Sequence, residues 1–407
     1  MLGEKHRQNR DTWQRRRVEC ITQSREHHSD LSRRSDVKIL IGVCGIGQGH
    51  ITRQSVIAEL LLERGHTLSF LTYGPGVETL KARFPDSLVL PVYVPWVACG
   101  PDGLRFMETV RRSGWRAIPG ILRDLSLIRR FRQSEPFDLC ISDYEPVTAR
   151  VAYATRTPLI TLDQQSKLLG FETSPIGELS RKEERARLGL FFPKATKRIA
   201  LSYFRVNAAP DHRFRVELRP PMVRSEIQND DQETRPEHTL VYLSNYGSDS
   251  FVHLPDLVAS LATMPNRRFT IFDSLGRRCE APLNVVFEEI DREFFPKVLA
   301  DSDSVISTAG FNLISECVAA EVPIMTIPLA TYDQHLCSRT VETLRIGMGL
   351  KETRSPTPGE LAAFVQQISN ARHSMRTNPD VLKPSPTSTR KLIDEIEAVA
   401  KPFQDRG

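Results

Sequence analysis

The chain has 407 residues, of which 40% are hydrophobic and 26% charged, and its formal net charge is +5. This length is sufficient for two domains of ordinary size, each with its own hydrophobic core. The small net charge excludes neither an anionic substrate nor loose contact with a membrane surface, and it requires neither. No apolar run approaches the roughly 18 residues that span a bilayer, and the polar N-terminus predicts no signal peptide.

The cysteines form no CxxC pair, which argues against structural zinc and against a disulfide framework. We therefore expect no metal, and a reducing cytoplasmic location. The cysteines are Cys20, Cys44, Cys99, Cys140, Cys279, Cys317 and Cys337.

Residues 1–36 carry nine Lys or Arg and six Asp or Glu among many polar residues. This composition predicts a disordered or loosely ordered extension. A nucleic-acid-binding arm is the alternative, but the mixed charge favours a solvated tail, so we expect no nucleic-acid partner.

Ordered structure is predicted to begin at residue 37, with a buried strand over residues 37–43, a glycine-rich turn over 44–50 and a helix to residue 64. A second strand at 67–72 completes a βαβ unit of the kind that binds nucleotides. The turn lacks the dinucleotide fingerprint, because His50 stands where its last glycine belongs. This weakens a dehydrogenase interpretation.

His50 is the candidate catalytic base, because it follows a strand at the start of a helix, on the edge where sites form. The helix dipole disfavours the charged imidazolium, and a base acts in the neutral form. The alternative is a histidine that only starts the helix. Asp143 ends the strand at 139–142 on the same edge, where it could also simply cap the next helix. Asp163 and Gln164 end the following strand.

Residues 111–132 form a basic amphipathic segment. We expect its apolar face to pack inward, and contact with a lipid headgroup or a hydrophobic acceptor is the alternative. The apolar residues are Trp115, Ile118, Ile121, Leu122, Leu125 and Ile128.

A Pro-Pro pair and a polar run predict a linker at 226–237. The first domain would then span 37–225 and the second 238–390, and a C-terminal helix in 391–407 could cross back to the first domain.

The stretch from residue 304 to 334 reads as strand, small-residue turn, helix and strand. Free N–H groups at the start of its helix suit a phosphate. Glu316 lies about one and a half turns into the helix, where its carboxylate could accept from two ribose hydroxyls. Asp333 and Gln334 follow the next strand and could reach an attached sugar. The pattern therefore favours a nucleotide sugar.

This stretch resembles the donor box of GT-B glycosyltransferases of the UDP-glycosyltransferase and peptidoglycan N-acetylglucosaminyltransferase type. The matching residues are Gly310-Phe311-Asn312, Glu316, Pro328-Leu329 and Asp333-Gln334. Thr308 replaces a histidine of the box, and Leu313 replaces a serine, so phosphate binding would rely more on backbone N–H groups. The layout looks closest to a little-described bacterial and archaeal branch.

Gln48-Gly49-His50-Ile51 matches the run whose histidine deprotonates the acceptor, and Asp143 matches the aspartate that pairs with it. The resemblance implies donor contacts from Ser244, Asn245, Tyr246, Gly247, Ile290, Thr308, Ala309, Gly310, Phe311, Asn312, Glu316, Asp333 and Gln334. The residues expected to contact the acceptor are Gly47, Gln48, Gly49, Asp163 and Gln164.

The implied fold is α/β of the GT-B type, with two Rossmann-like parallel-sheet domains facing a cleft. The implied activity is inverting, metal-independent transfer of a hexose from a nucleotide sugar, with UDP expected, to a hydroxyl of a small-molecule or lipid-linked acceptor. No cofactor and no obligate protein partner are expected, and peripheral membrane contact stays open. Two alternatives are an enzyme like UDP-N-acetylglucosamine 2-epimerase and a non-catalytic binder of nucleotide sugars.

Overall fold

The structure is a computed structural model. It describes residues 36–46, 48–94, 99–100, 103–104, 107–108, 111, 114–134, 137–171, 178–207, 214–224, 227, 237–244, 252–291, 293–329 and 331–404. Residues 37–407 belong to one compact unit. The extension predicted for residues 1–36 lies outside the described residues, apart from Asp36.

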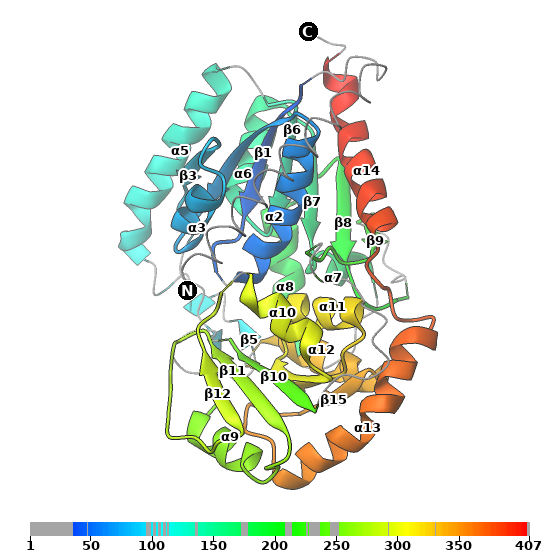
Figure 1. The fold of residues 1–407 in the computed structure, drawn as a ribbon. Helices are drawn as coiled ribbons and strands as arrows, with labels where there is room; N and C mark the ends of the chain where they lie inside the picture. Colours follow the sequence, from blue (N-terminus) through cyan, green and yellow to red (C-terminus); the bar gives the residue numbers. More distant parts are fainter. Residues whose placement is uncertain are drawn as a thin grey trace, which may run out of the picture. The chain divides into compact units, whose positions relative to one another are not determined.

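The first domain is built on a seven-stranded parallel sheet (Figure 1). Its strand order is β3 (Leu88–Pro91), β2 (Thr67–Thr72), β1 (Lys38–Val43), β6 (Leu139–Asp143), β7 (Leu159–Asp163), β8 (Lys197–Leu201) and β9 (Glu217–Arg219). The central strands β1, β6 and β7 are buried along almost their whole length, as continuous apolar runs predict for a parallel sheet covered by helices.

Helices connect these strands and cover the sheet. They are α2 (Gln48–Glu63), α3 (Gly76–Arg83), α5 (Ile118–Gln133), α6 (Pro146–Thr155), α7 (Lys167–Gly170) and α8 (Glu178–Phe191). The 3-10 helix η1 (Gly114–Ala117) leads into α5, and β4 (Cys99–Gly100) pairs with β5 (Gly103–Leu104) as a small antiparallel ribbon. Helix α2 begins three residues before the predicted position, so His50 lies within its first turn.

The second domain has a six-stranded parallel sheet. Its strand order is β12 (Val285–Glu288), β11 (Arg268–Asp273), β10 (His238–Leu243), β13 (Ser304–Thr308), β14 (Ile324–Ile327) and β15 (Gly347–Gly349). Its helices are α9 (Leu254–Leu261), α10 (Phe294–Asp301), α11 (Phe311–Ala320), α12 (Tyr332–Thr343) and α13 (Pro358–Thr377). Two parallel-sheet α/β domains confirm the predicted fold class. The segment between β9 and β10 contains the predicted linker, most of which lies outside the described residues.

The last helix, α14 (Pro386–Gln404), lies beside the first sheet in Figure 1. Its Glu397 accepts a hydrogen bond at 2.9 Å from His66 Nε2, and its Asp394 pairs with Arg64 at 2.7 Å. These contacts attach the end of the chain to α2 and β2. None of the described helices is long and apolar enough to cross a membrane.

The prediction that the apolar face of the 111–132 segment packs inward is wrong for most of that face. Trp115, Ile118, Ile121, Leu122 and Leu125 are all exposed. Helix α5 packs against the rest of the domain through another side of the helix. Its buried residues are Asp124 and Leu127, and Asp124 accepts hydrogen bonds from the Tyr93 backbone N–H.

Glu145 generates a prediction about stability. Its buried carboxylate caps α6 by accepting from the Val147 and Thr148 backbone N–H groups, at 2.7 and 2.8 Å, and from the Thr148 hydroxyl at 2.6 Å. Gly42 lies directly beneath, where a Cβ would come within 2.6 Å of a Glu145 carboxylate oxygen. We expect Glu145→Ala to lower the free energy of unfolding by about 2 kcal/mol, because it leaves buried donors without an acceptor.

Denaturant unfolding measures this change, with Glu78→Ala as the control, since the Glu78 side chain is 82% exposed. A Glu145→Ala loss no larger than that of the control would contradict this role for the cap.

Candidate active site

One cavity of about 890 Å³ is lined by residues of both domains. Twelve of the residues predicted to bind or catalyse line it. They are Gly49, His50, Gln164, Ser244, Ile290, Thr308, Gly310, Phe311, Asn312, Glu316, Asp333 and Gln334. The strand ends of the two sheets therefore converge on one space, as open α/β sheets predict.

The remaining predicted residues lie elsewhere. Asp143 lies behind His50, and Ala309 is fully buried beside the cavity wall. Asp163 is also buried and accepts from the Ser166 N–H at 2.6 Å, so it holds a turn and does not face the cavity. Gln48 begins α2. Outside the described residues lie Gly47, Asn245, Tyr246 and Gly247.

His50 and Asp143 form a close pair at the carboxyl ends of β1 and β6. The His50 Nδ1 atom lies 2.9 Å from Asp143 Oδ1, and the His50 side chain is 15% exposed while that of Asp143 is fully buried. The His50 ring stacks against Tyr144, with 6.3 Å between the ring centroids. A carboxylate on Nδ1 fixes the orientation of the ring, which is the geometry that a histidine base requires.

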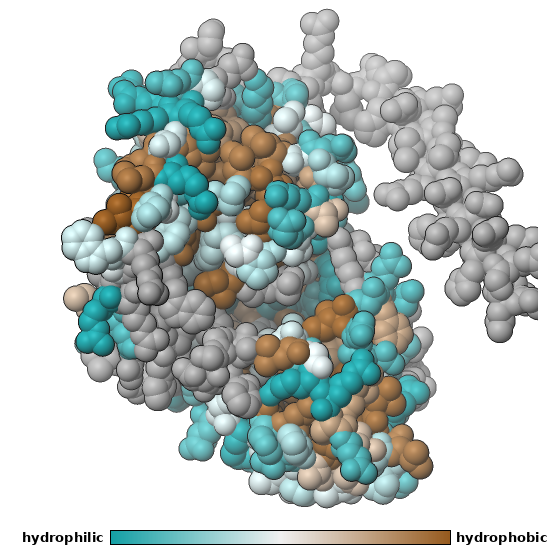
Figure 2. All heavy atoms as spheres, turned by 90° about the vertical axis from the view of Figure 1, so that its left-hand side faces the viewer, coloured by the Kyte–Doolittle hydropathy of each residue, from teal (hydrophilic) through white to brown (hydrophobic). Residues whose placement is uncertain are grey.

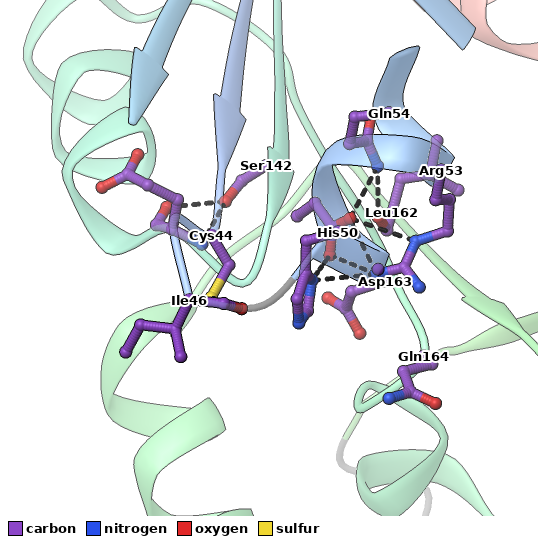
Figure 3. Close-up of polar contacts among 12 residues, drawn as sticks. Cys44, Ile46, His50, Arg53, Gln54, Ser142, Leu162, Asp163 and Gln164 are labelled. Atoms are coloured by element: carbon purple, nitrogen blue, oxygen red, sulfur yellow. Dashed lines mark hydrogen bonds and ion pairs between the residues drawn. The ribbon is translucent and has the colours of Figure 1, made fainter. Parts of the chain in front are cut away.

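Arg53 belongs to the same cluster, although the sequence analysis missed it (Figure 3). Its guanidinium donates to both Asp143 oxygens at 2.7 Å, and Gln54 Nε2 donates to Oδ2 at 3.0 Å. Arg53 follows His50 by three residues, so helical spacing alone could have placed both side chains on one face. Burial alone raises the pKa of Asp143, but attraction to Arg53 and His50 outweighs burial and lowers that pKa to about 2.

The cluster extends into the second domain through Asn312. Arg53 donates to the side-chain oxygen Oδ1 of Asn312 at 3.1 Å. The side-chain nitrogen Nδ2 of Asn312 donates in turn to the backbone carbonyl of Gly49. A Cβ at position 49 would lie only 2.9 Å from the Asn312 amide nitrogen, so a larger residue there would push this side chain out of its present position. The start of α11 is therefore bonded to the first turn of α2.

The pKa of His50 differs from the sequence-based expectation of a neutral imidazole. Burial lowers this pKa, but attraction to Cys44 and then to Asp143 raises it to about 10. The Cys44 sulfur lies 3.1 Å from the Tyr73 hydroxyl. Burial raises the pKa of this thiol, but attraction to His50 together with hydrogen bonds to His50, Tyr73 and the Ile46 carbonyl lowers it overall. Attraction to Cys44 and Asp143 therefore outweighs the effect of burial on the His50 pKa.

On the opposite wall, Glu316 is held by Arg224. Arg224 Nε donates to Glu316 Oε1 at 2.9 Å, and Arg224 Nη2 donates to Glu316 Oε2 at 3.1 Å. Both side chains line the cavity. Arg224 was missed because it precedes the predicted linker, where nothing in the local pattern indicates a site.

The other donor-box side chains are also held by neighbours. Thr308 ends β13 rather than lying in the predicted turn, and its Oγ1 lies 2.5 Å from Ser244 Oγ. Asp333 accepts from Gln164 Nε2 of the first domain at 2.6 Å. Gln334 Oε1 accepts from the Leu329 N–H at 2.8 Å. Asp333 and Gln164 therefore form a second bridge between the domains.

Three further residues, Tyr144, Glu184 and Arg187, form the first-domain wall beside His50. The Tyr144 hydroxyl donates to Glu184 at 2.5 Å, and the Arg187 guanidinium lies 5.2 Å from the Tyr144 ring centroid. Tyr144 has a φ of 58°, an uncommon conformation that non-glycine residues adopt mainly at functional sites and tight turns. Among the residues that the structure describes, no group of three or more His, Cys, Asp or Glu side chains could hold a metal ion.

A family model described as Glycosyl transferase family 1 matches residues 37–369 of this chain. The chain therefore belongs to that family and is a glycosyltransferase. Two relatives from Methanosarcina acetivorans, both described as uncharacterized glycosyltransferases, are each 23% identical to it. One alignment covers 72% of this chain and 79% of the relative, and the other covers 88% and 96%.

Solved structures show the same fold. Phytolacca americana UGT2, complexed with UDP-2-fluoro-glucose and pterostilbene, is 14% identical with a TM-score of 0.62, over 90% of this chain and 100% of that one. MurG of Acinetobacter baumannii is 14% identical with a TM-score of 0.55, over 89% of this chain and 100% of that one. The chain has the GT-B fold that the sequence predicted.

The Cys44–His50 contact predicts an alkaline titration. We expect His50 in the ligand-free protein to lose its proton near pH 10. In Cys44→Ser this pKa should fall toward the ordinary value of 6.5, because a serine hydroxyl does not ionise and so cannot supply the attraction that Cys44 does. NMR titration of histidine-labelled protein measures the His50 pKa in wild type and in Cys44→Ser. The His50 signal is assigned by its loss in His50→Ala. Identical titration in wild type and Cys44→Ser would contradict the interaction.

The same shift has a consequence for stability. Because folding raises the pKa of His50, the stability that this group contributes is complete below about pH 6.5 and is lost as the pH rises toward 10.

Proposed function

We propose that the protein is an inverting, metal-independent hexosyltransferase that uses a UDP sugar and a hydroxyl acceptor, either a small molecule or a lipid-linked one. One observation carries the proposal. His50, oriented by Asp143 at 2.9 Å, shares a single cavity with Glu316 and the other described donor-box residues of the second domain.

The donor would bind against the start of α11. Gly310 caps this helix without any side-chain hydrogen bond, so the N–H groups of the first turn can receive a diphosphate. Thr308 is already bonded to Ser244, which fits a phosphate site made of backbone N–H groups. The Arg224 guanidinium supplies positive charge in the same part of the cavity.

Glu316 would accept hydrogen bonds from the ribose hydroxyls. Arg224 donates one hydrogen bond to each carboxylate oxygen, and an ionised carboxylate offers about four acceptor positions in all. Binding of UDP-2-fluoro-glucose by Phytolacca americana UGT2 supports a UDP hexose for a chain of the same fold.

The reaction would be a single displacement. His50 Nε2, in its neutral form, takes the proton of the acceptor hydroxyl while the acceptor oxygen attacks the anomeric carbon. Because the pKa of His50 in the ligand-free protein is about 10, the fraction of neutral base grows as the pH rises toward that value. The bond from that carbon to the diphosphate oxygen breaks, and the diphosphate leaves with the bonding electron pair, so the anomeric configuration inverts. Asp143 stabilises the imidazolium that forms. The N–H groups at the start of α11 stabilise the charge that develops on the diphosphate.

Donor binding tests the first half of this proposal. We expect Glu316→Gln to weaken UDP binding about ten- to a hundredfold, because hydrogen bonds to a charged carboxylate are lost. Calorimetric titration with UDP measures the change, with dTDP and GDP as comparison ligands. Glu280→Gln, at an exposed position of the same domain, is the matched control. Equal UDP affinity in the two variants would show that Glu316 does not bind the donor.

The base role of His50 is tested by turnover. His50→Ala should lower kcat by more than about two orders of magnitude, as loss of a general base does, and should leave UDP affinity unchanged. Release of UDP from UDP-glucose, measured with a panel of alcohols and phenols as acceptors, gives kcat. The control is His253→Ala, because the His253 side chain is 62% exposed and does not line the cavity. Retained activity in His50→Ala would end the base assignment.

A further inference from the structure

A row of exposed apolar side chains runs along η1 and α5. Trp115 is 88% exposed and Leu122 57%, and Ile118, Ile121 and Leu125 are also exposed. We call these five residues the α5 stripe. They recur every three or four residues, so they share one side of the helix. Figure 2 faces the side of the molecule on which α5 lies, and hydrophobic residues gather over that part of the surface.

The exposed charges of helix α5 itself all have one sign. Helix α5, all of whose residues are described, exposes Arg123, Arg129, Arg130 and Arg132. Its one carboxylate, Asp124, is buried, and both of its oxygens accept from the Tyr93 N–H at 3.1 Å. The helix therefore presents positive charge and no negative charge to its surroundings.

The fold of the domain does not require these apolar residues. Helix α5 packs through Leu127 and Asp124, and Gly120 lies against the Tyr93 ring. A contiguous exposed apolar row of this size marks an interaction surface. A helix with apolar residues on one side and arginines beside them fits the headgroup region of an anionic membrane, where a tryptophan side chain is also favoured.

A second set of exposed apolar residues, on the second domain, differs in charge. Its members are Leu275, Leu283, Val286, Ile290 and Phe294. Its exposed charges are of both signs. The carboxylates are Glu280, Glu289, Asp291 and Glu293, and the cations include Arg278 and Lys297. Because this second set lies among exposed carboxylates and α5 exposes none, α5 matches an anionic membrane better.

We infer that the α5 stripe docks the first domain on the surface of an anionic phospholipid membrane. Trp115, Leu122 and the other apolar side chains of the stripe enter the boundary between headgroups and acyl chains. Arg129 and Arg132, each seven residues beyond a leucine of the stripe and so on the same side of α5, contact lipid phosphates. This contact needs no donor and no acceptor, so it does not depend on the proposed transfer reaction.

Cosedimentation with vesicles tests the inference on the full chain. We expect binding to vesicles of phosphatidylcholine with phosphatidylglycerol, weakened by added salt, and at least about tenfold weaker binding to phosphatidylcholine alone. The double variant Leu122→Ser with Leu125→Ser should bind the anionic vesicles at least about tenfold more weakly than wild type, because it removes apolar surface that enters the membrane on binding. The matched control is Leu283→Ser, which should bind as wild type does, since Leu283 is fully exposed on the other domain.

A second double variant, Arg129→Gln with Arg132→Gln, tests the contribution of the positive charge while the apolar residues of the α5 stripe stay unchanged. It should bind anionic vesicles more weakly and lose much of the salt dependence. Undiminished binding by both double variants would overturn the inference. So would concentration-dependent self-association of the wild type that Leu122→Ser with Leu125→Ser abolishes, because the stripe would then be covered by a second copy of this chain.

Discussion

The arrangement of the site depends on one buried carboxylate, that of Asp143. A buried charge is costly unless it is paired and hydrogen-bonded. Here His50, Arg53 and Gln54 all lie within 3.1 Å of its oxygens. Removing one partner of such a pair costs about 3–5 kcal/mol, so the cluster fixes the first turns of α2 against the end of β6. The catalytic histidine of the proposal is thus oriented by an interaction that also stabilises the domain.

The same cluster connects the two halves of the cavity. Arg53 reaches Asn312 in the donor-box helix, and Asn312 bonds in turn to the Gly49 carbonyl beside His50. Gln164 and Asp333 make a second connection. His50 and the donor-box helix are therefore connected by hydrogen bonds, in addition to apolar contact between the domains such as that of Tyr203 with Phe311. A donor that moved α11 would also move the partners of Arg53, which couples donor position to the orientation of the base.

The sequence predicts the fold and twelve of the residues that line the cavity, because both follow from local patterns. Parallel strands end at one edge of each sheet, and His50, Glu316 and Asp333 follow such strand ends. The partners of these residues come from tertiary structure, and sequence patterns did not show them. Arg224 reaches Glu316 from 92 positions away in the chain, and the pKa of His50 is set by Cys44 and Asp143 together. The error at α5 has a similar origin, because an apolar helical face shows amphipathicity but not which side packs.

The central claim is that His50 drives a single displacement at the anomeric carbon. The most direct measurement is the anomeric configuration of the first product formed from UDP-glucose, an α-linked donor, followed by proton NMR with water, alcohols and phenols as acceptors. Single displacement predicts that the β anomer forms first, before any free sugar equilibrates, at a rate far above that of His50→Ala. An α product at the outset, or turnover no faster than in that variant, would contradict the claim.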